Sequence, residues 1–144
     1  RKPFNNHGIL EYADINQNGK DLIEKFDIRS QSEKEAVGSL SGGNQQKVIV
    51  AREIASKPDL LIAANPTRGV DVGAIEYIHE KINDERNDGR AVLLVSFELD
   101  EILKLSDRVV VMHAGEIVGE IDPKNTSAEE LGLMMAGKKI ADAE

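Results

Sequence analysis

Residues 40–47 read Leu-Ser-Gly-Gly-Asn-Gln-Gln-Lys, and this stretch decides how the rest of the sequence is interpreted. Two adjacent glycines, Gly42 and Gly43, let a ligand approach the backbone closely and expose peptide N–H groups. Ser41 adds a hydroxyl donor, and the helix predicted to follow directs its N-terminal amides and its positive dipole end to the same point. A plain turn that caps a helix is the simpler interpretation of Ser-Gly-Gly alone. The full order of eight residues favours a phosphate site built from main chain.

Downstream of this stretch, helical and extended patterns alternate. Apolar side chains at helical spacing predict a helix over 44–56, which Pro58 ends. The apolar run at 60–64 is typical of a strand that is buried on both faces. A helix over 72–88, which Gly89 ends, is followed by a second buried strand over 91–96 and a short helix over 98–106. A β-hairpin over 108–121 comes next, and a last helix is opened by the capping box of Ser127 and Glu130.

The residues upstream are more polar. Four apolar side chains within 22–28 predict a short helix that runs into an extended piece, and residues 30–38 predict a loop. Residues 14–19 imitate the start of a calcium-binding loop, but Lys25 stands where such a loop needs a bidentate Glu, so we expect a polar turn. The order of elements predicts an α/β fold with a mostly parallel sheet, a C-terminal hairpin and a helical region that carries residues 40–47.

The composition limits the classes of function. The chain has 144 residues, 40% of them hydrophobic, which is enough to bury a core. Its 18 basic and 26 acidic residues give a net charge of −8, which argues against a general nucleic-acid binder. The absence of cysteine excludes disulfides, zinc–thiolate sites and thiol catalysis. No apolar run approaches the ~20 residues of a membrane span.

The stretch at 40–47 resembles the signature motif of the ATP-binding-cassette (ABC) ATPases, in the form typical of carbohydrate and nucleoside importers. We call it the signature segment. Other motifs of that family follow in the same order: residues 60–67 resemble the Walker B strand, residues 68–74 the D-loop, and residues 95–101 the switch region. The resemblance runs from about residue 20 to about residue 122 and implies a partial P-loop nucleotide-binding domain.

Three positions depart from the family pattern. The Walker B strand of the family ends in an Asp–Glu pair that orients Mg²⁺ and the attacking water, whereas this chain has Ala64 and Asn65. Phe97 replaces the switch histidine and can neither donate nor accept a proton. The resemblance therefore implies degenerate positions: we expect no catalytic residue, no metal ligand and only weak nucleotide binding by this chain alone.

The phosphate loop of the family, Gly-x4-Gly-Lys-Ser/Thr, has one near-match at residues 132–139. Lys139 stands there in place of the Mg²⁺-binding Ser or Thr, and the interior lies on the helix opened by Ser127. We interpret Gly137 as the C-terminus of that helix. By the resemblance, the phosphate loop is expected in sequence before Arg1.

The resemblance implies a role in trans. Two cassettes of this family pair head to tail, and each ATP site combines one phosphate loop with the signature of the partner. We therefore expect the signature to contact ATP held by another cassette, together with Mg²⁺ in the assembled transporter, through Leu40, Ser41, Gly42, Gly43 and Asn44. Asp71 is expected at the cassette–cassette interface; a helix N-cap before Val72 is its simpler role, and the two are compatible.

The implied protein is the C-terminal part of the ATP-binding subunit of a sugar or nucleoside importer, peripheral at the cytoplasmic face of the membrane. Its implied partners are the N-terminal cassette of the same subunit, membrane permeases and, indirectly, a solute-binding protein, but no nucleic acid. We expect a signature-bearing helical region over about 1–56, a core over about 57–122 and a C-terminal helix and tail over about 123–144. A non-catalytic regulatory module that keeps the ABC fold, or a soluble ABC ATPase outside transport, are the alternatives.

Other polar residues have simpler interpretations. His79 lies one residue off the apolar stripe of the 72–88 helix, so we expect it at the boundary of the core. His113 falls in a hairpin turn and is expected to be solvated. The preference of helix N-termini for acids explains Glu98, Asp100 and Glu101.

Overall fold

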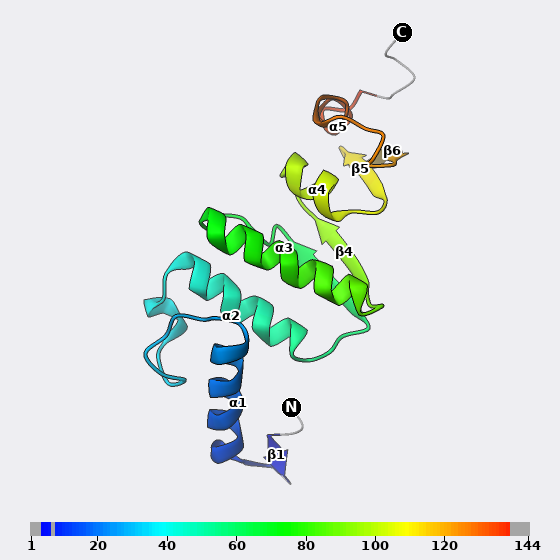
Figure 1. Cartoon of the computed structure of the whole chain (residues 1–144). Helices are drawn as coiled ribbons and strands as arrows, with labels where there is room; N and C mark the ends of the chain where they lie inside the picture. Colours follow the sequence, from blue (N-terminus) through cyan, green and yellow to red (C-terminus); the bar gives the residue numbers. More distant parts are fainter. Residues whose placement is uncertain (1–3, 7, 139–144) are drawn as a thin grey trace.

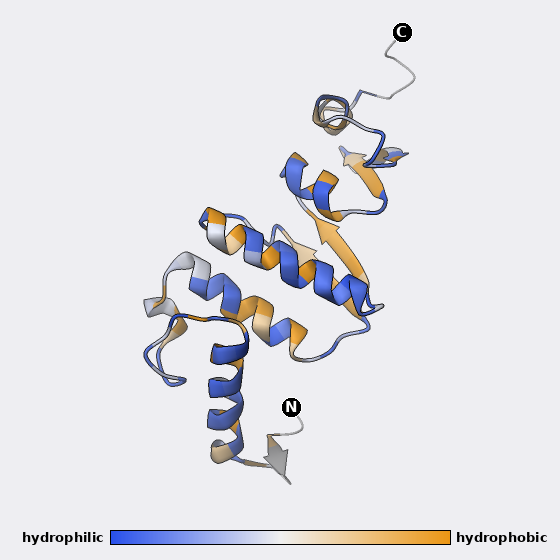
Figure 2. Ribbon diagram, viewed as in Figure 1, coloured by the Kyte–Doolittle hydropathy of each residue, from blue (hydrophilic) through white to orange (hydrophobic). Residues whose placement is uncertain are grey.

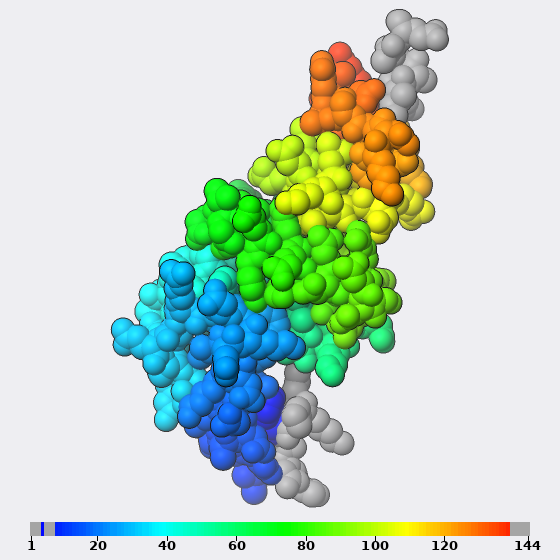
Figure 3. Space-filling model, viewed as in Figure 1, coloured from blue at the N-terminus to red at the C-terminus, as the bar shows by residue number. Residues whose placement is uncertain are grey.

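The computed structural model of the chain describes residues 4–6 and 8–138. Figures 1 and 3 show the elements following one another along an elongated molecule, from α1 near the N-terminus to the C-terminal hairpin and α5. Their order is β1 (Asn5–Asn6), β2 (Ile9–Leu10), α1 (Tyr12–Lys25), the 3-10 turn η1 (Val37–Ser39), α2 (Gly42–Ile54), β3 (Leu60–Ala64), α3 (Val72–Asn87), β4 (Ala91–Val95), α4 (Leu99–Leu105), β5 (Val109–His113), β6 (Glu116–Ile121) and α5 (Ala128–Met135).

The signature helix and the elements after it are confirmed to within two residues at their ends. Local signals account for this accuracy. Gly89 ends α3 with a positive φ of 84°, which glycine adopts without strain. Ser127 and Glu130 form the predicted capping box of α5, which satisfies backbone N–H groups at both ends of the box. Gly137, with a φ of 94°, follows the end of α5, so the phosphate-loop near-match is a helix C-terminus, as interpreted.

Three separate strand pairs form the sheets of the described residues. The central pair, β3 with β4, is parallel, and its register runs from Leu60 opposite Ala91 to Ala64 opposite Val95. The other two pairs, β1 with β2 and β5 with β6, are antiparallel. Helix α3 makes the crossover between the parallel strands, which is the α/β arrangement that the sequence predicts. The predicted hairpin is confirmed, as a two-stranded sheet of its own.

The prediction that β3 and β4 are buried on both faces is wrong. Leu61 is 9% exposed, but Ile62 is 61% exposed, and Leu93 and Val95 of β4 are about half exposed. Side chains alternate across a strand, so one face of this pair packs on helices while the other stays open. Figure 2 shows the apolar colour of β4 beside the mixed surface of α3. A run of apolar residues hides this alternation in the sequence.

The first helix is longer than predicted. α1 starts at Tyr12, so residues 14–19 are helical, and the prediction of a polar turn there is wrong. None of the α1 side chains is buried, and Figure 2 colours most of the helix as hydrophilic. Its first turns are mostly polar, and the two side chains that pack against a core cluster, Leu22 and Ile23, lie in its last turn. Within the described ranges, no helix is long and apolar enough to span a membrane.

The buried apolar side chains form three clusters along the molecule. The first lies between α2, β3 and the segment after α1, the second between α3 and the helical face of the parallel strands, and the third under α5 and the hairpin. Their buried members are Phe26, Ile28, Ala51, Ile54 and Leu61; Ile78, Ile82 and Leu105; and Ile102, Val109, Val111, Ile121, Leu131 and Met134. The signature segment lies at the start of the helix that the first two clusters share through Val50.

Candidate functional site: the signature helix and the Walker B cleft

The N-terminus of α2 presents free backbone donors. Ser41 occupies the N-cap position with an extended backbone, but its side chain does not cap the helix. Within the described residues, the amides of Gly42, Gly43 and Asn44 have no hydrogen-bond acceptor, whereas Gln45 N–H already donates to Ser41 O. Three neighbouring N–H groups and the positive end of a helix dipole therefore face the same region, which is the arrangement that binds an anion.

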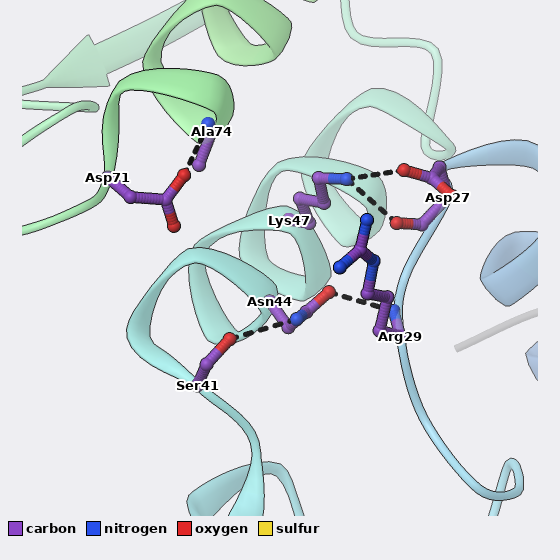
Figure 4. Close-up of polar contacts among 7 residues, drawn as sticks. All are labelled: Asp27, Arg29, Ser41, Asn44, Lys47, Asp71 and Ala74. Atoms are coloured by element: carbon purple, nitrogen blue, oxygen red, sulfur yellow. Dashed lines mark hydrogen bonds and ion pairs between the residues drawn. The ribbon is translucent and has the colours of Figure 1, made fainter.

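Ser41 is held in place by its neighbours. Asn44 Nδ2 donates to Ser41 Oγ at 2.9 Å, and Asn44 Oδ1 accepts from Arg29 N–H at 2.8 Å (Figure 4). Since Ser41 Oγ accepts in this bond, its own O–H is left as a donor. The nitrogen and the oxygen of the Asn44 side-chain amide both have partners within the chain, so this side chain is fixed and orients Ser41. Leu40 is half-buried, and its carbonyl accepts from Gln45 Nε2 at 2.8 Å.

An open groove of about 470 Å³ lies beside the signature segment. The residues that line it come from the loop before η1 and from the signature segment with the residue before it: Arg29, Ser30, Gln31, Glu35, Ser39, Leu40, Ser41 and Asn44. Glu35 braces the loop, because it accepts from Gln31 N–H at 2.6 Å and from Ser30 and Ser39 hydroxyls at 2.9 Å. These donors lower the pKa of the Glu35 carboxyl below its ordinary value.

Gly43 lets α2 approach the start of α3 closely. A Cβ at this position would lie 2.7 Å from Asp71 Oδ2 and 3.1 Å from the Ala74 Cβ. Asp71 caps α3, since its Oδ1 accepts from Ala74 N–H at 3.0 Å (Figure 4). The simpler role of Asp71, a helix N-cap, is confirmed; its role at a cassette interface stays a prediction. The same Cβ at Gly42 would meet only Gly69 O, at 3.5 Å.

Lys47 fixes the other end of the signature segment. Its Nζ donates to the carbonyl and to Oδ2 of Asp27, both at 2.8 Å, and lies 4.5 Å from the centre of the Tyr77 ring. The Lys47 ammonium beside Asp27 lowers the pKa of that carboxyl through a hydrogen bond and through its charge. This contact ties the segment after α1 to α2 and α3.

A second hollow, of about 400 Å³, lies at the carboxyl ends of β3 and β4. We call it the Walker B cleft; its lining residues are Asn65, Thr67, Arg68, Ser96, Phe97 and Glu98. Asn65 adopts a left-handed backbone with a φ of 46°, which Asn tolerates better than most residues. Ala64 is exposed, and Phe97 is 74% exposed. The cleft thus brings together two of the three degenerate positions, with neither a carboxylate nor an imidazole at either.

A buried polar cluster is the part of this region that sequence reasoning missed. Glu101 is 3% exposed; its Oε1 accepts from Thr67 Oγ1 at 2.8 Å and lies 3.0 Å from His79 Nε2. Glu101 lies in the first turn of α4, as predicted, but it is buried; the predicted boundary position of His79 is wrong. Glu101 lies 34 residues after Thr67 and 22 residues after His79, so no short sequence pattern indicates that these side chains are in contact. His113 is exposed, as expected, but it ends β5, and its Nδ1 lies 2.9 Å from Met135 O.

The chemistry available is therefore binding of an anion at the start of α2. Within residues 4–6 and 8–138, no three acidic or imidazole side chains are grouped so that they could hold a metal ion. The anion site uses main-chain donors, so the net negative charge of the chain does not oppose it locally.

Comparison with known proteins finds a family model that matches the first part of the chain and relatives that match nearly all of it. The ABC transporter family model matches residues 3–68. The chain is 52% identical over 140 residues to the nucleoside import ATP-binding protein NupA of Lactococcus lactis and 48% identical over 143 residues to the guanosine import ATP-binding protein NupO of Bacillus subtilis. It is also 48% identical to the glucose import ATP-binding protein TsgD13 of Haloferax volcanii. These matches cover 97–99% of this chain but only 26–28% of the relatives, so the chain spans about a quarter of their length.

The solved structures that resemble it are ABC cassettes. A dimeric bacterial ABC transporter cassette aligns with a TM-score of 0.68 at 21% identity and covers 84% of this chain and 52% of the cassette. An ATP-binding subunit of an ABC transporter aligns with a TM-score of 0.70 at 22% identity, over 90% of this chain and 57% of the subunit. At these identities the likeness concerns the fold. Sequence matches, fold and motif order agree: the chain is similar to part of the ATP-binding domain of ABC transporters.

Proposed function

We propose that this chain is part of the ATP-binding subunit of an importer of nucleosides or sugars, and that it supplies its signature to ATP held by a second cassette. Ser41, Gly42 and Gly43 contact the γ-phosphate of that ATP, while the chain's own Walker B cleft does not hydrolyse nucleotide. Relatives named as nucleoside, guanosine and glucose import ATP-binding proteins support the importer role. Two of these three names specify a nucleoside, which favours nucleosides over sugars as the imported substrate.

The observation that carries the proposal is the free N-terminus of α2. The amides of Gly42, Gly43 and Asn44 have no acceptor within the described residues, and the Ser41 hydroxyl is oriented by Asn44. A helix start that served only to cap itself would use the Ser41 side chain as an acceptor for these amides. Their freedom instead supports binding of an external phosphate.

The Walker B cleft supports the asymmetric part of the proposal. Asn65 is neutral and Ala64 has no ligand atom, so neither holds Mg²⁺ or activates water as a carboxylate does. Phe97 offers an exposed apolar ring at the switch position. Mg²⁺ in the assembled protein is therefore held with the ATP of the partner cassette, where the partner supplies the ligands.

The proposed partners follow from the same reasoning. A signature that acts in trans requires a cassette with its own phosphate loop, which we place in the other half of the same subunit. Transport further requires permease subunits in the membrane and, through them, a solute-binding protein. The chain would then work at the cytoplasmic face of the membrane. Its acidic charge gives no support to a nucleic-acid partner.

ATP turnover by the intact subunit tests the proposal. Ser41→Arg places a long side chain at the start of α2, where the phosphate must approach. We expect turnover to fall about a hundredfold, the loss typical when a donor to developing phosphate or oxyanion charge is removed. The 144-residue chain by itself is expected to show no turnover. Unchanged turnover in the Ser41→Arg subunit would refute the role in trans and would favour a regulatory module that merely keeps the fold.

A further inference from the structure

Three buried polar side chains from different elements meet at one carboxylate oxygen. Glu101, in α4, accepts from Thr67 Oγ1 at 2.8 Å through its Oε1. His79 Nε2, in α3, lies 3.0 Å from the same oxygen. All three side chains belong to residues that are at most 7% exposed. We call them the Glu101 cluster; it joins the loop after β3 to two helices.

Stability alone does not account for the Glu101 cluster. Burial of a carboxylate is costly unless its hydrogen-bonding capacity is filled. Within the described residues, Glu101 Oε2 and His79 Nδ1 have no hydrogen-bond partner. Apolar side chains of similar volume would fill the same space at equal or lower cost. The polar groups therefore point to a positional role, in which direction and distance matter more than net stabilisation.

The loop that Thr67 belongs to is also held from the opposite side, by the signature helix. Gln46 Nε2, in α2, donates to Pro66 O at 2.7 Å. Adjacent residues of one loop are thus tied to two different helices, Pro66 to α2 and Thr67 to α4. The donor Gln46 lies one turn after Gly42, and α4 begins two residues after Phe97. Two hydrogen bonds, linked by the peptide bond between Pro66 and Thr67, therefore connect α4, beside the Walker B cleft, to the first turns of α2.

We propose that Glu101 is a positioning residue that couples the Walker B cleft to the N-terminus of the signature helix. A displacement of α4 moves Thr67 through Glu101, and the loop moves α2 through Gln46. The coupling itself is a property of this chain. Its consequence rests on the proposed function: the state of the chain's own cleft sets the orientation of the signature toward the ATP of the partner cassette.

Hydrogen exchange of backbone amides in the 144-residue chain tests the coupling directly. Thr67→Val removes the hydroxyl donor and keeps the shape of the side chain, whereas Thr67→Ser keeps the donor. We expect Thr67→Val to raise exchange about tenfold both in the loop, residues 65–71, and at the amides of Gln45 and Gln46, the first hydrogen-bonded amides of α2, which is the factor expected for one lost buried hydrogen bond. Thr67→Ser should restore protection at both places.

A control and a second variant guard against a mere loss of folding. Thr126→Val breaks an exposed hydrogen bond of similar length, from Thr126 Oγ1 to Asp122 O at 2.9 Å, remote from α2, and should leave exchange at Gln45 and Gln46 unchanged. The triple change Thr67→Val, His79→Leu and Glu101→Leu removes every polar group of the cluster, so we expect the chain to unfold at the same urea concentration. Exchange at Gln45 and Gln46 should nevertheless rise. Protection there that is unaffected by both Thr67→Val and the triple change overturns the proposal.

ATP turnover by the intact subunit separates this inference from the proposed function. If both hold, Thr67→Val lowers kcat, leaves the KM for ATP unchanged, and is rescued by Thr67→Ser. Faster exchange at Gln45 and Gln46 in Thr67→Val, with unchanged kcat in both Thr67→Val and Ser41→Arg, would uphold the coupling and refute the proposed function. A loss of turnover in Ser41→Arg, with unchanged protection of Gln45 and Gln46 in Thr67→Val, would uphold the proposed function and refute the coupling.

Discussion

The two glycines of the signature segment have different roles, and alanine substitutions separate them. A Cβ at Gly43 would lie 2.7 Å from Asp71 Oδ2 and 3.1 Å from the Ala74 Cβ, both closer than side chains tolerate. Asp71 is not free to move away, because its other oxygen accepts from Ala74 N–H. A Cβ at Gly42 would meet only Gly69 O, at the ordinary distance of 3.5 Å.

The expected magnitudes follow from these contacts. Overpacking in such a place costs about 1–3 kcal/mol, and displacement of a helix N-cap adds about 1 kcal/mol. Replacement of glycine by alanine in a helix returns about 0.5–1 kcal/mol. We therefore expect Gly43→Ala to lower the free energy of unfolding by about 1–3 kcal/mol, and Gly42→Ala to leave it unchanged or to raise it by up to about 1 kcal/mol.

Urea unfolding of the 144-residue chain, followed by circular dichroism, measures both variants under the same conditions. Asp71→Ser provides an internal check, because serine still caps α3 but withdraws the carboxylate oxygen that faces Gly43. In the Gly43→Ala background this second change should recover part of the lost stability. Equal stability of Gly43→Ala and Gly42→Ala would refute the close approach of α2 to α3.

Three further predictions concern the remainder of the chain. Leu131→Ala should lower the free energy of unfolding by about 2–5 kcal/mol in urea melts, because this side chain is 1% exposed in the hairpin cluster, whereas the exposed Leu133→Ala should cost less than about 1 kcal/mol. Ser127→Ala should cost about 1 kcal/mol by the same measurement, since it removes the acceptor for Glu130 N–H; a cost near zero would contradict the capping box. Stability should fall as the pH drops below the ordinary pKa values of 4.5 for Glu and 3.8 for Asp. Hydrogen bonds lower the folded-state pKa of Asp27, Glu35 and Glu130, so each contributes stability above its unfolded pKa that is lost as the pH falls through the folded one. The acid slope should shrink in the triple variant with Asp27→Asn, Glu35→Gln and Glu130→Gln, and an unchanged slope would contradict these contacts.

The sequence predicts best what local rules govern. The capping box at Ser127, the stop at Gly89 and the hairpin around Ala114 and Gly115 each need only a few neighbouring residues, and all are confirmed. Both turn residues of the hairpin have positive φ values, 49° and 85°, which suits the twist of the two strands. The signature segment was recognised for the same reason: its eight residues are contiguous.

What the sequence did not reveal depends on partners far along the chain. The open face of β3 follows from which side α2 and α3 cover, and an all-apolar strand gives no sign of it. The burial of Glu101 requires Thr67, 34 residues earlier, to lie opposite it. Helix α1 extends further upstream than predicted because its first turns carry mostly polar side chains, and only Leu22 and Ile23 in its last turn pack against a core cluster.

The most direct test of the central claim is ATP turnover by the intact subunit that carries Gly42→Ala, compared with Gly132→Ala. Both changes add one methyl group to a helix at a position without a close contact, since a Cβ at Gly132 would lie 3.7 Å from Leu99 Cδ1. Only Gly42 belongs to the free start of α2 that we assign to phosphate. We predict that Gly42→Ala lowers turnover about a hundredfold while Gly132→Ala does not. Equal turnover in the two variants would contradict the claim that this chain's signature acts on the ATP of a partner cassette.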